Sequence, residues 1–161
     1  MIVQGGQFFE FLKKWRFVVL VALVFLALRL PALYYPYHQD EWKNVASSAT
    51  VEGAGKFFAH PPLMQVAFVG AHEIFGADNF RIFPLLISVV SIFLLYAVVR
   101  RRSSEKAANW VIALFTISFY GILGSLQPDV DGSILPFLFL LCVYAYDRWN
   151  EAIDSGNTVL G

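Results

Sequence analysis

Apolar residues along the chain form four long runs that are separated by more polar segments. The runs cover residues 17–35, 82–99, 107–126 and 133–149. Each holds about 17–20 residues, the length that an α-helix needs to cross the hydrocarbon core of a bilayer. Backbone groups in lipid must form their hydrogen bonds within the protein, so helices are expected rather than open strands. The pattern predicts an all-α, multi-pass membrane protein with four transmembrane helices.

The segment between the first two runs, residues 36–81, is predicted to be an outer loop. Its apolar stretch 63–75 is short for a span and is interrupted by polar residues. Two interfacial helices, at about 41–51 and 62–75, are therefore expected to lie flat on the outer membrane face. No repeat or linker divides the sequence, so residues 1–161 are interpreted as a single membrane domain.

Composition supports a membrane location. The chain is 58% hydrophobic and only 15% charged, whereas a soluble domain is about 45–50% apolar and about 25% charged. Its mean hydropathy is +0.60. The formal net charge is zero, which gives no basis for nucleic-acid binding. The single cysteine, Cys142, excludes an internal disulfide.

The first run raises the alternative of a cleaved signal peptide. Basic residues precede twelve uninterrupted apolar residues, 17–28, a length typical of a signal-peptide core. However, no small-residue cleavage site follows, because residues 29–35 continue apolar and aromatic. We interpret this run as a retained membrane anchor.

The distribution of basic residues predicts the orientation. Cytoplasmic segments carry an excess of Lys and Arg, and the basic residues fall mostly on the side of the N-terminus. The topology is therefore predicted to place both termini in the cytoplasm, with loop 36–81 outside the plasma membrane. The basic residues predicted to be cytoplasmic are Lys13, Lys14, Arg16, Arg100, Arg101, Arg102, Lys106 and Arg148.

Acidic pairs occur in both predicted outer connections. Asp40 and Glu41 follow the first run, and Asp129 and Asp131 lie in the turn between the third and fourth runs. Such pairs are absent from the predicted cytoplasmic connection. A carboxylate near lipid is costly to bury and marks a functional site by default. The alternative is that these groups are only solvated charges at helix ends.

A second motif, AHPPL at residues 59–63, also lies in the outer loop. Two prolines restrict the backbone, and Pro62 suits the first turn of a helix. The motif is therefore expected to hold His60 at the start of the second interfacial helix. Arg29 and Arg81 lie near the outer ends of the first two runs, where each could simply extend to lipid head groups.

Taken together, these motifs resemble the GT-C membrane glycosyltransferases, and within them the protein O-mannosyltransferase and aminoarabinose-transferase superfamily. The similar stretches are LRLPALYYPYHQDEW, AHPPLMQVAFVGAHEIFGADNFRIFPLLISVVSIFLLYAVVRR and QPDVDGSILPFLFLLCVYAYDR. The quoted stretches begin at Leu28 and end at Arg148, and the resemblance as a whole extends from about residue 19 to residue 148. The resemblance implies transfer of a sugar from a polyprenyl- or dolichyl-phosphate donor to a hydroxyl acceptor on the extracytoplasmic face.

The resemblance also implies roles for the residues of the first outer loop. Asp40 would be the general base, and Glu41 would be its companion. His60, with Arg29 and Arg81, would bind the donor phosphate. A divalent Mg²⁺ or Mn²⁺ held by Asp40, Glu41 and His60 would suit such ligands, although transfer without a metal is equally open.

At the second outer turn, the resemblance implies that Asp129 and Asp131 contact the acceptor or a metal. Gln127 departs from the pattern, because many family members have an arginine there. The family enzymes also have more spans than this chain. Further transmembrane helices, from the rest of the gene product or from a partner, are therefore expected to complete the donor groove, and the isolated chain is expected to be inactive.

Two other functions remain open at this point. A non-catalytic multi-pass subunit or scaffold, which binds lipid or a partner, would explain the short chain. A transporter or channel component is disfavoured, because the last three runs have no ionisable residue between their ends.

Overall fold

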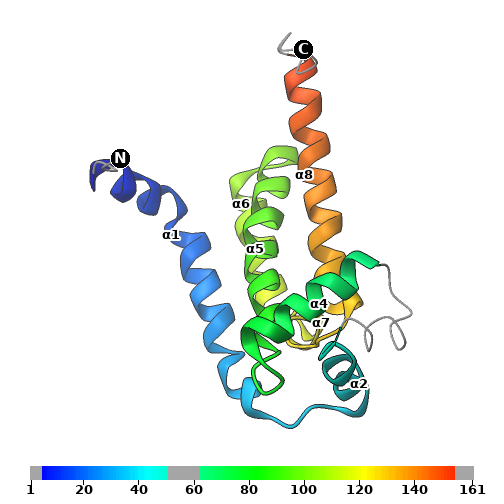
Figure 1. Cartoon of the computed structure of the whole chain (residues 1–161). Helices are drawn as coiled ribbons and strands as arrows, with labels where there is room; N and C mark the ends of the chain where they lie inside the picture. The colour runs from blue at the N-terminus through cyan, green and yellow to red at the C-terminus, as the bar shows by residue number, and fades with distance from the viewer. Residues whose placement is uncertain (1–4, 51–61, 155–161) are drawn as a thin grey trace.

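The computed structural model of the protein describes residues 5–50 and 62–154. This part of the chain contains helices and no strands, which agrees with the predicted all-α class (Figure 1). The elements are α1 (Gly5–Ala27), the 3₁₀-helix η1 (Leu30–Tyr34), α2 (Gln39–Ser47), α4 (Pro62–Phe75), α5 (Ile82–Arg102), α6 (Glu105–Ile117), α7 (Phe119–Gly124), the π-helical turn η2 (Val130–Ile134) and α8 (Leu135–Asp154).

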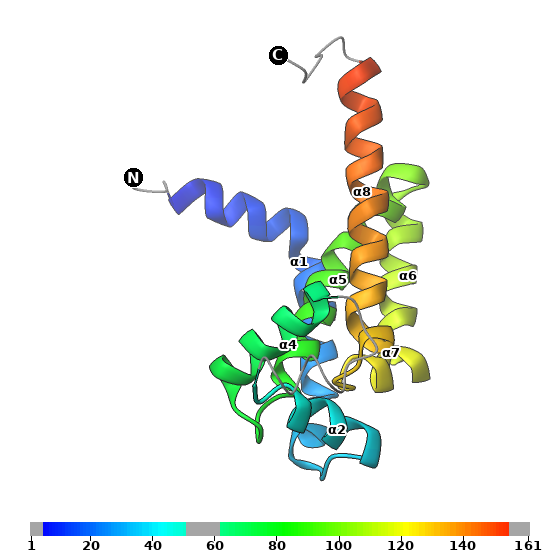
Figure 2. The same cartoon turned by 45° about the vertical axis from the view of Figure 1, so that its right-hand side comes forward.

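Helix α5 lies at the centre of the bundle. It packs against α1, α6 and α8, and Figures 1 and 2 show α5, α6 and α8 standing side by side. The short elements α2, α4 and α7 gather at one end of these helices, which we call the loop end. The beginning of α1 and the end of α8 extend away from the loop end.

In the part of the chain that the structure describes, two helical segments are long and apolar enough to cross a membrane: Trp15–Tyr34 and Ile82–Arg102. They correspond to the first and second predicted spans. Helix α8 corresponds to the fourth predicted span, but it continues to Asp154 and therefore carries charged residues in its last turns.

The third predicted span differs from the expectation, because residues 107–126 form two helices rather than one. Ser118 interrupts them with an extended backbone (φ −67°, ψ 145°) and caps α7, since its Oγ accepts a hydrogen bond from the Gly121 amide at 3.0 Å. A serine offers the backbone this alternative to continuing a helix. Hydrophobicity is unbroken across Ser118, so the apolar pattern alone does not reveal the break.

The two helices predicted for the outer loop are both present. Helix α4 spans Pro62–Phe75, as predicted, and ends at Gly76, whose left-handed φ of 69° is typical of a helix C-terminus. Helix α2 covers Gln39–Ser47, so it begins and ends earlier than the predicted 41–51. Its early start places both Asp40 and Glu41 in the first turn, where the helix dipole favours negative charge.

Two clusters of buried apolar side chains hold these elements together. The first joins α1, α5 and α6 through residues such as Phe25, Ile92 and Ile112. The second fixes α2 and α4 against the loop end of α5 through Val45, Phe68 and Phe80, with further members Met64, Ala71 and Ile134.

Many large apolar side chains point outward from the bundle. Leu20, Leu23, Leu114 and Phe139 are each more than half exposed. Exposed apolar surface of this extent marks contact with lipid or with other proteins. The first cluster therefore accounts for only one face of each long helix.

A close approach of two backbone segments shapes the loop end. Gly124 in α7 faces Gly132 in η2, and a Cβ atom added to Gly124 would lie 2.8 Å from the Gly132 carbonyl oxygen. Small residues at helix contacts allow this kind of approach in membrane proteins. The buried serines around the contact are Ser88, Ser91, Ser125 and Ser133.

We expect Gly124→Ala to destabilise the protein by about 1–3 kcal/mol, because the new methyl group meets fixed backbone atoms. The matched control is Gly70→Ala in α4, where an added Cβ meets nothing within 4 Å. That control should be neutral or stabilising by up to about 1 kcal/mol. Thermal unfolding in detergent measures both, and equal stability of the two variants would contradict the packing described.

Candidate functional site

Arg81 lies at the centre of the loop end and is 6% exposed. It precedes α5, and its Nε and Nη2 donate to the two carboxylate oxygens of Glu41 at 3.2 and 2.7 Å. Its Nη1 donates to the carbonyls of Ala32 (3.0 Å) and Tyr35 (2.6 Å), and Nη2 also donates to Pro36 (3.1 Å). A guanidinium has about five N–H donors, so every donor of Arg81 is used inside the protein.

Glu41 connects this arginine to α2. The Glu41 side chain is 11% exposed, and its Oε2 also accepts a hydrogen bond from the His38 amide at 2.6 Å. Bidentate arginine–carboxylate pairs are strong and fix geometry. The pair therefore holds the segment after the first span, helix α2 and the start of α5 in one arrangement.

Aromatic contacts reinforce the pair. The Arg81 guanidinium lies 4.6 Å from the centroid of the Tyr37 ring, and the Tyr37 ring meets Trp42 edge-on at 5.1 Å. The Tyr37 hydroxyl donates to the Ala77 carbonyl at 2.7 Å. Burial raises the pKa of Tyr37, so its phenol keeps this donor proton at neutral pH.

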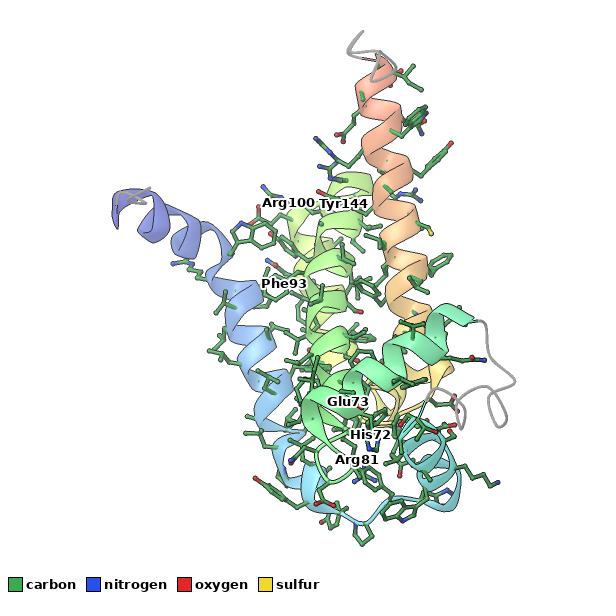
Figure 3. The ribbon with its side chains drawn as sticks, in the orientation of Figure 1. His72, Glu73, Arg81, Phe93, Arg100 and Tyr144 are labelled. Carbon is green, nitrogen blue, oxygen red and sulfur yellow. The ribbon has the colours of Figure 1, made fainter. Side chains whose placement is uncertain are left out.

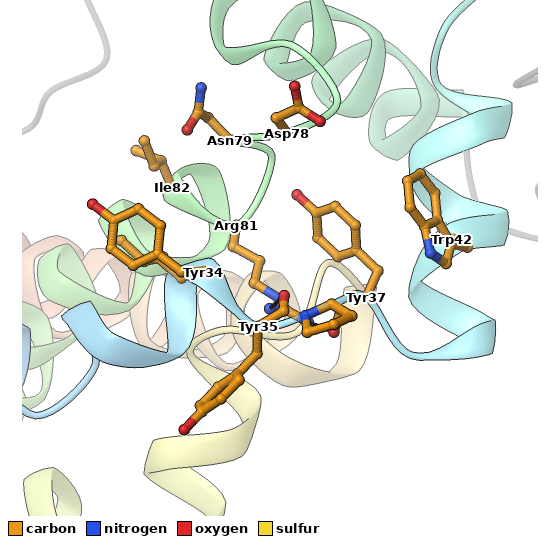
Figure 4. A pocket seen from close by; sticks show the side chains of 10 residues that line it. Tyr34, Tyr35, Tyr37, Trp42, Asp78, Asn79, Arg81 and Ile82 are labelled. Atoms are coloured by element: carbon orange, nitrogen blue, oxygen red, sulfur yellow. Dashed lines mark hydrogen bonds between the residues drawn. The ribbon is translucent and has the colours of Figure 1, made fainter.

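Two pockets adjoin Arg81. The aromatic pocket, of about 400 Å³, is shown in Figure 4; Tyr34, Tyr35, Trp42, Asp78 and Asn79 are among the residues that line it. The second pocket, of about 510 Å³, lies on the side of α7. It is lined by Ala32, Tyr35, His38, Glu41, Arg81, Leu123, Leu126 and Gln127.

The two acidic segments of the predicted outer face come together. The Asn44 side chain in α2 donates to the Pro128 carbonyl at 2.9 Å, and Pro128 is fully buried. Helix α2 therefore packs against the turn that contains Asp129. Asp40 is the second residue of α2; its side chain and that of Asp131 lie outside what the structure describes, as does the whole of His60.

Arg29 is buried completely, so it does not extend to head groups. Its guanidinium donates to Ser125 Oγ (2.8 Å) and to the carbonyls of Phe25 (2.9 Å) and Thr116 (3.0 Å). The break at Ser118 frees carbonyls at the end of α6, where the helix dipole attracts a cation. Arg29 therefore connects α1 to α6 and α7, a role that its position in the sequence did not indicate.

Sequence reasoning also missed Tyr37 and Asn44. The only available signal was their position on either side of the DE pair. Because their partners are backbone carbonyls 40 and 84 residues away, pattern analysis has no means of locating them.

The predicted metal site of Asp40, Glu41 and His60 stays a prediction, because the Asp40 side chain and His60 lie outside what the structure describes. Glu41 is the one predicted ligand whose side chain is described. Both of its oxygens accept hydrogen bonds from Arg81 or His38, which leaves it poorly placed as a cation ligand. Among the side chains that the structure describes, no group of three or more His, Cys, Asp or Glu residues could hold a metal ion.

The fold and the site define a helical protein with long apolar helices and a polar site at one end of them. The family model of dolichyl-phosphate-mannose-protein mannosyltransferases matches residues 59–153, more than half of the sequence, and the chain belongs to this family. No curated protein and no solved structure matches it. The matched region includes Arg81 and the turn around Pro128, and it begins after Asp40 and Glu41. The protein is thus a glycosyltransferase-like membrane protein.

We expect Arg81→Met to lower the free energy of unfolding by about 3–5 kcal/mol, because it leaves the Glu41 carboxylate buried and unpaired. The matched control is Arg102→Met, which loses an exposed pair with Asp147 and should lower the free energy of unfolding far less, because solvent screens such pairs. Chemical unfolding in detergent provides both values.

The double variant Arg81→Met with Glu41→Leu should recover part of the loss, since replacing both members of a buried pair is often neutral. If Arg81→Met were no more destabilising than Arg102→Met, the buried pair would not organise the loop end.

Proposed function

We propose that the protein transfers a sugar from a polyprenyl- or dolichyl-phosphate donor to a hydroxyl acceptor at the extracytoplasmic membrane face. Membership of the mannosyltransferase family supports the class of reaction. The main structural support for the proposed site is the position of α2. The Glu41–Arg81 pair and the Asn44–Pro128 bond fix this helix, and with it the backbone of Asp40, beside the second pocket.

The proposed topology has four membrane crossings, made by α1 with η1, by α5, by α6 with α7, and by α8. Both termini are then cytoplasmic, and the loop end faces the outside of the plasma membrane. The positions of the arginines support this arrangement. Figure 3 shows Arg81 at the loop end of α5 and Arg100 at its other end, where Arg101 and Arg102 pair with Glu151 and Asp147 of α8.

The second pocket suits a lipid-linked donor. Leu123 and Leu126 give it an apolar wall, while His38 and Gln127 are polar. A prenyl chain gains free energy by leaving water for apolar surface, at about 25 cal/mol per Å². The phosphate-linked end of the donor would then lie near α2. Further transmembrane helices, from the rest of the gene product or from a partner, would complete the groove around the lipid.

In the proposed reaction, the acceptor oxygen attacks the anomeric carbon as the bond from that carbon to the donor phosphate oxygen breaks. The Asp40 carboxylate accepts the hydroxyl proton, which contributes roughly 10²–10⁴-fold to the rate. The departing lipid phosphate carries the negative charge and is stabilised by a nearby cation or hydrogen-bond donor. His60 is the proposed phosphate contact, and Asp129 and Asp131 are proposed to contact the acceptor.

Glu41 and Arg81 have a different part in this proposal. The Glu41 carboxylate accepts hydrogen bonds from Arg81, and Arg81 also donates to backbone carbonyls. The two residues therefore position α2 instead of touching the reacting atoms. Arg29 likewise holds α1 against α6 and α7.

We expect Asp40→Asn to abolish sugar transfer while the protein still inserts into the membrane, because the amide cannot accept the acceptor's proton. The assay measures transfer from a polyprenyl-phosphate sugar in native membranes, where the complete gene product and any partners are present. The control variant is Glu73→Gln on the exposed face of α4, which should keep full transfer.

Wild-type turnover by Asp40→Asn would remove Asp40 as the base. Loss of transfer in both variants would show that the assay reports folding or insertion, and the assignment of the base would then have no support.

A further inference from the structure

A third pocket lies at the end of the bundle opposite to Arg81. It has a volume of about 400 Å³ and is enclosed by three helices: α1 contributes Trp15, α5 contributes Tyr96, Ala97, Arg100 and Arg101, and α8 contributes Tyr144 and Glu151. Figures 1 and 2 show the first part of α1 turning away from α5 and α8 at this level. We call it the arginine pocket.

The arginines at this end differ in how far they are neutralised. Arg102 makes a bidentate pair with Asp147, at 3.0 and 2.7 Å. Arg101 donates to Glu151 at 2.5 Å, and Glu151 also accepts from Arg148 at 2.9 Å. Two arginines therefore share one carboxylate, which leaves a positive charge beside the pocket.

Of the two arginines that line the pocket, Arg100 has the more available guanidinium. Its nearest carboxylate is the exposed Glu105, at 3.6 Å, which is too far for a good hydrogen bond. In the described part of the chain, the Arg100 side chain donates no hydrogen bond, and it is 37% exposed. Its donors are thus free for a ligand in the pocket that it lines.

Aromatic rings hold these cations at the boundary of the apolar bundle. The guanidinium of Arg100 lies 5.9 Å from the centroid of the Tyr96 ring, and that of Arg101 lies 5.1 Å from the Tyr144 ring. Trp15 packs against Tyr96 with ring centroids 5.3 Å apart. Tyr and Trp rings are enriched where a membrane helix meets the head groups, so the pocket lies at head-group depth.

We propose that the arginine pocket binds the phosphate of an anionic phospholipid, with Arg100 as the principal donor. A planar guanidinium matches phosphate oxygens in a bidentate manner. Basic pockets between transmembrane helices are suited to anionic head groups. The acyl chains would lie along the exposed apolar side chains of the helices. This site is separate from the candidate sugar-transfer site and does not depend on that function.

The test compares lipid binding to the purified full chain in detergent by native mass spectrometry, with phosphatidylglycerol and phosphatidylcholine as probes. We expect the wild-type protein to prefer phosphatidylglycerol about tenfold, because both lipids offer a phosphate but the choline cation of phosphatidylcholine is repelled by the arginines beside the pocket. Arg100→Gln should lose this preference. Arg102→Gln is the matched control, because Arg102 already forms a bidentate pair with Asp147 and does not line the pocket, and it should keep the preference.

A second variant guards against misfolding. Arg100→Lys keeps the charge but loses the planar fork, and should retain a preference between those of the wild type and Arg100→Gln. Soluble glycerol 3-phosphate should compete poorly, because it has no acyl chains to bury.

Three outcomes would overturn the proposal. The first is an absence of preference in the wild-type protein. The second is an equal loss in Arg100→Gln and Arg102→Gln, which would indicate diffuse surface charge. The third is competition by glycerol 3-phosphate as strong as that by the lipid, which would indicate a site for a free phosphate.

Discussion

The buried pair between Arg81 and Glu41 is the interaction on which the loop end depends. The Arg81 guanidinium donates all its hydrogen bonds to one carboxylate and three backbone carbonyls. The segments that contain these acceptors therefore have little freedom to move. The carboxylate binds the first turn of α2, and the carbonyls belong to the chain just after the first apolar helix. A charged group this deeply buried is tolerated only when it is fully hydrogen-bonded. The position of Asp40 follows from this constraint.

A second buried arginine, Arg29, provides hydrogen bonds where helix α6 ends. The break at Ser118 leaves carbonyls at the end of α6 without helical partners, and unsatisfied carbonyls are costly inside an apolar bundle. Arg29 donates to one of them and to Ser125. Both arginines therefore join segments that are far apart in the sequence. The two arginines that the resemblance suggested as phosphate ligands are both engaged as structural connectors.

The apolar pattern predicted the long helices and the helix Pro62–Phe75. Burial determines how often apolar residues recur along a helix, and the thickness of the bilayer determines how long an apolar run must be. It did not predict the break at Ser118, since apolar residues continue on both sides of it; the spacing of Ser118 and Gly121 was the only local sign of a cap. The partners of Arg81 and Arg29 are mostly backbone carbonyls, which every residue offers, so no pattern identifies them. Asp40 and Glu41 are equivalent as sequence neighbours, and only the structure shows that Glu41 is already engaged.

The account requires the loop end and the arginine pocket to lie on opposite sides of the bilayer. Single cysteines at the exposed positions Ala46 and Ser104, in a Cys142→Ser background, test this directly with a membrane-impermeant thiol reagent on intact cells. The account predicts that the cysteine at position 46 reacts on intact cells and that the one at position 104 reacts only after permeabilisation. Labelling of both from the same side would contradict it.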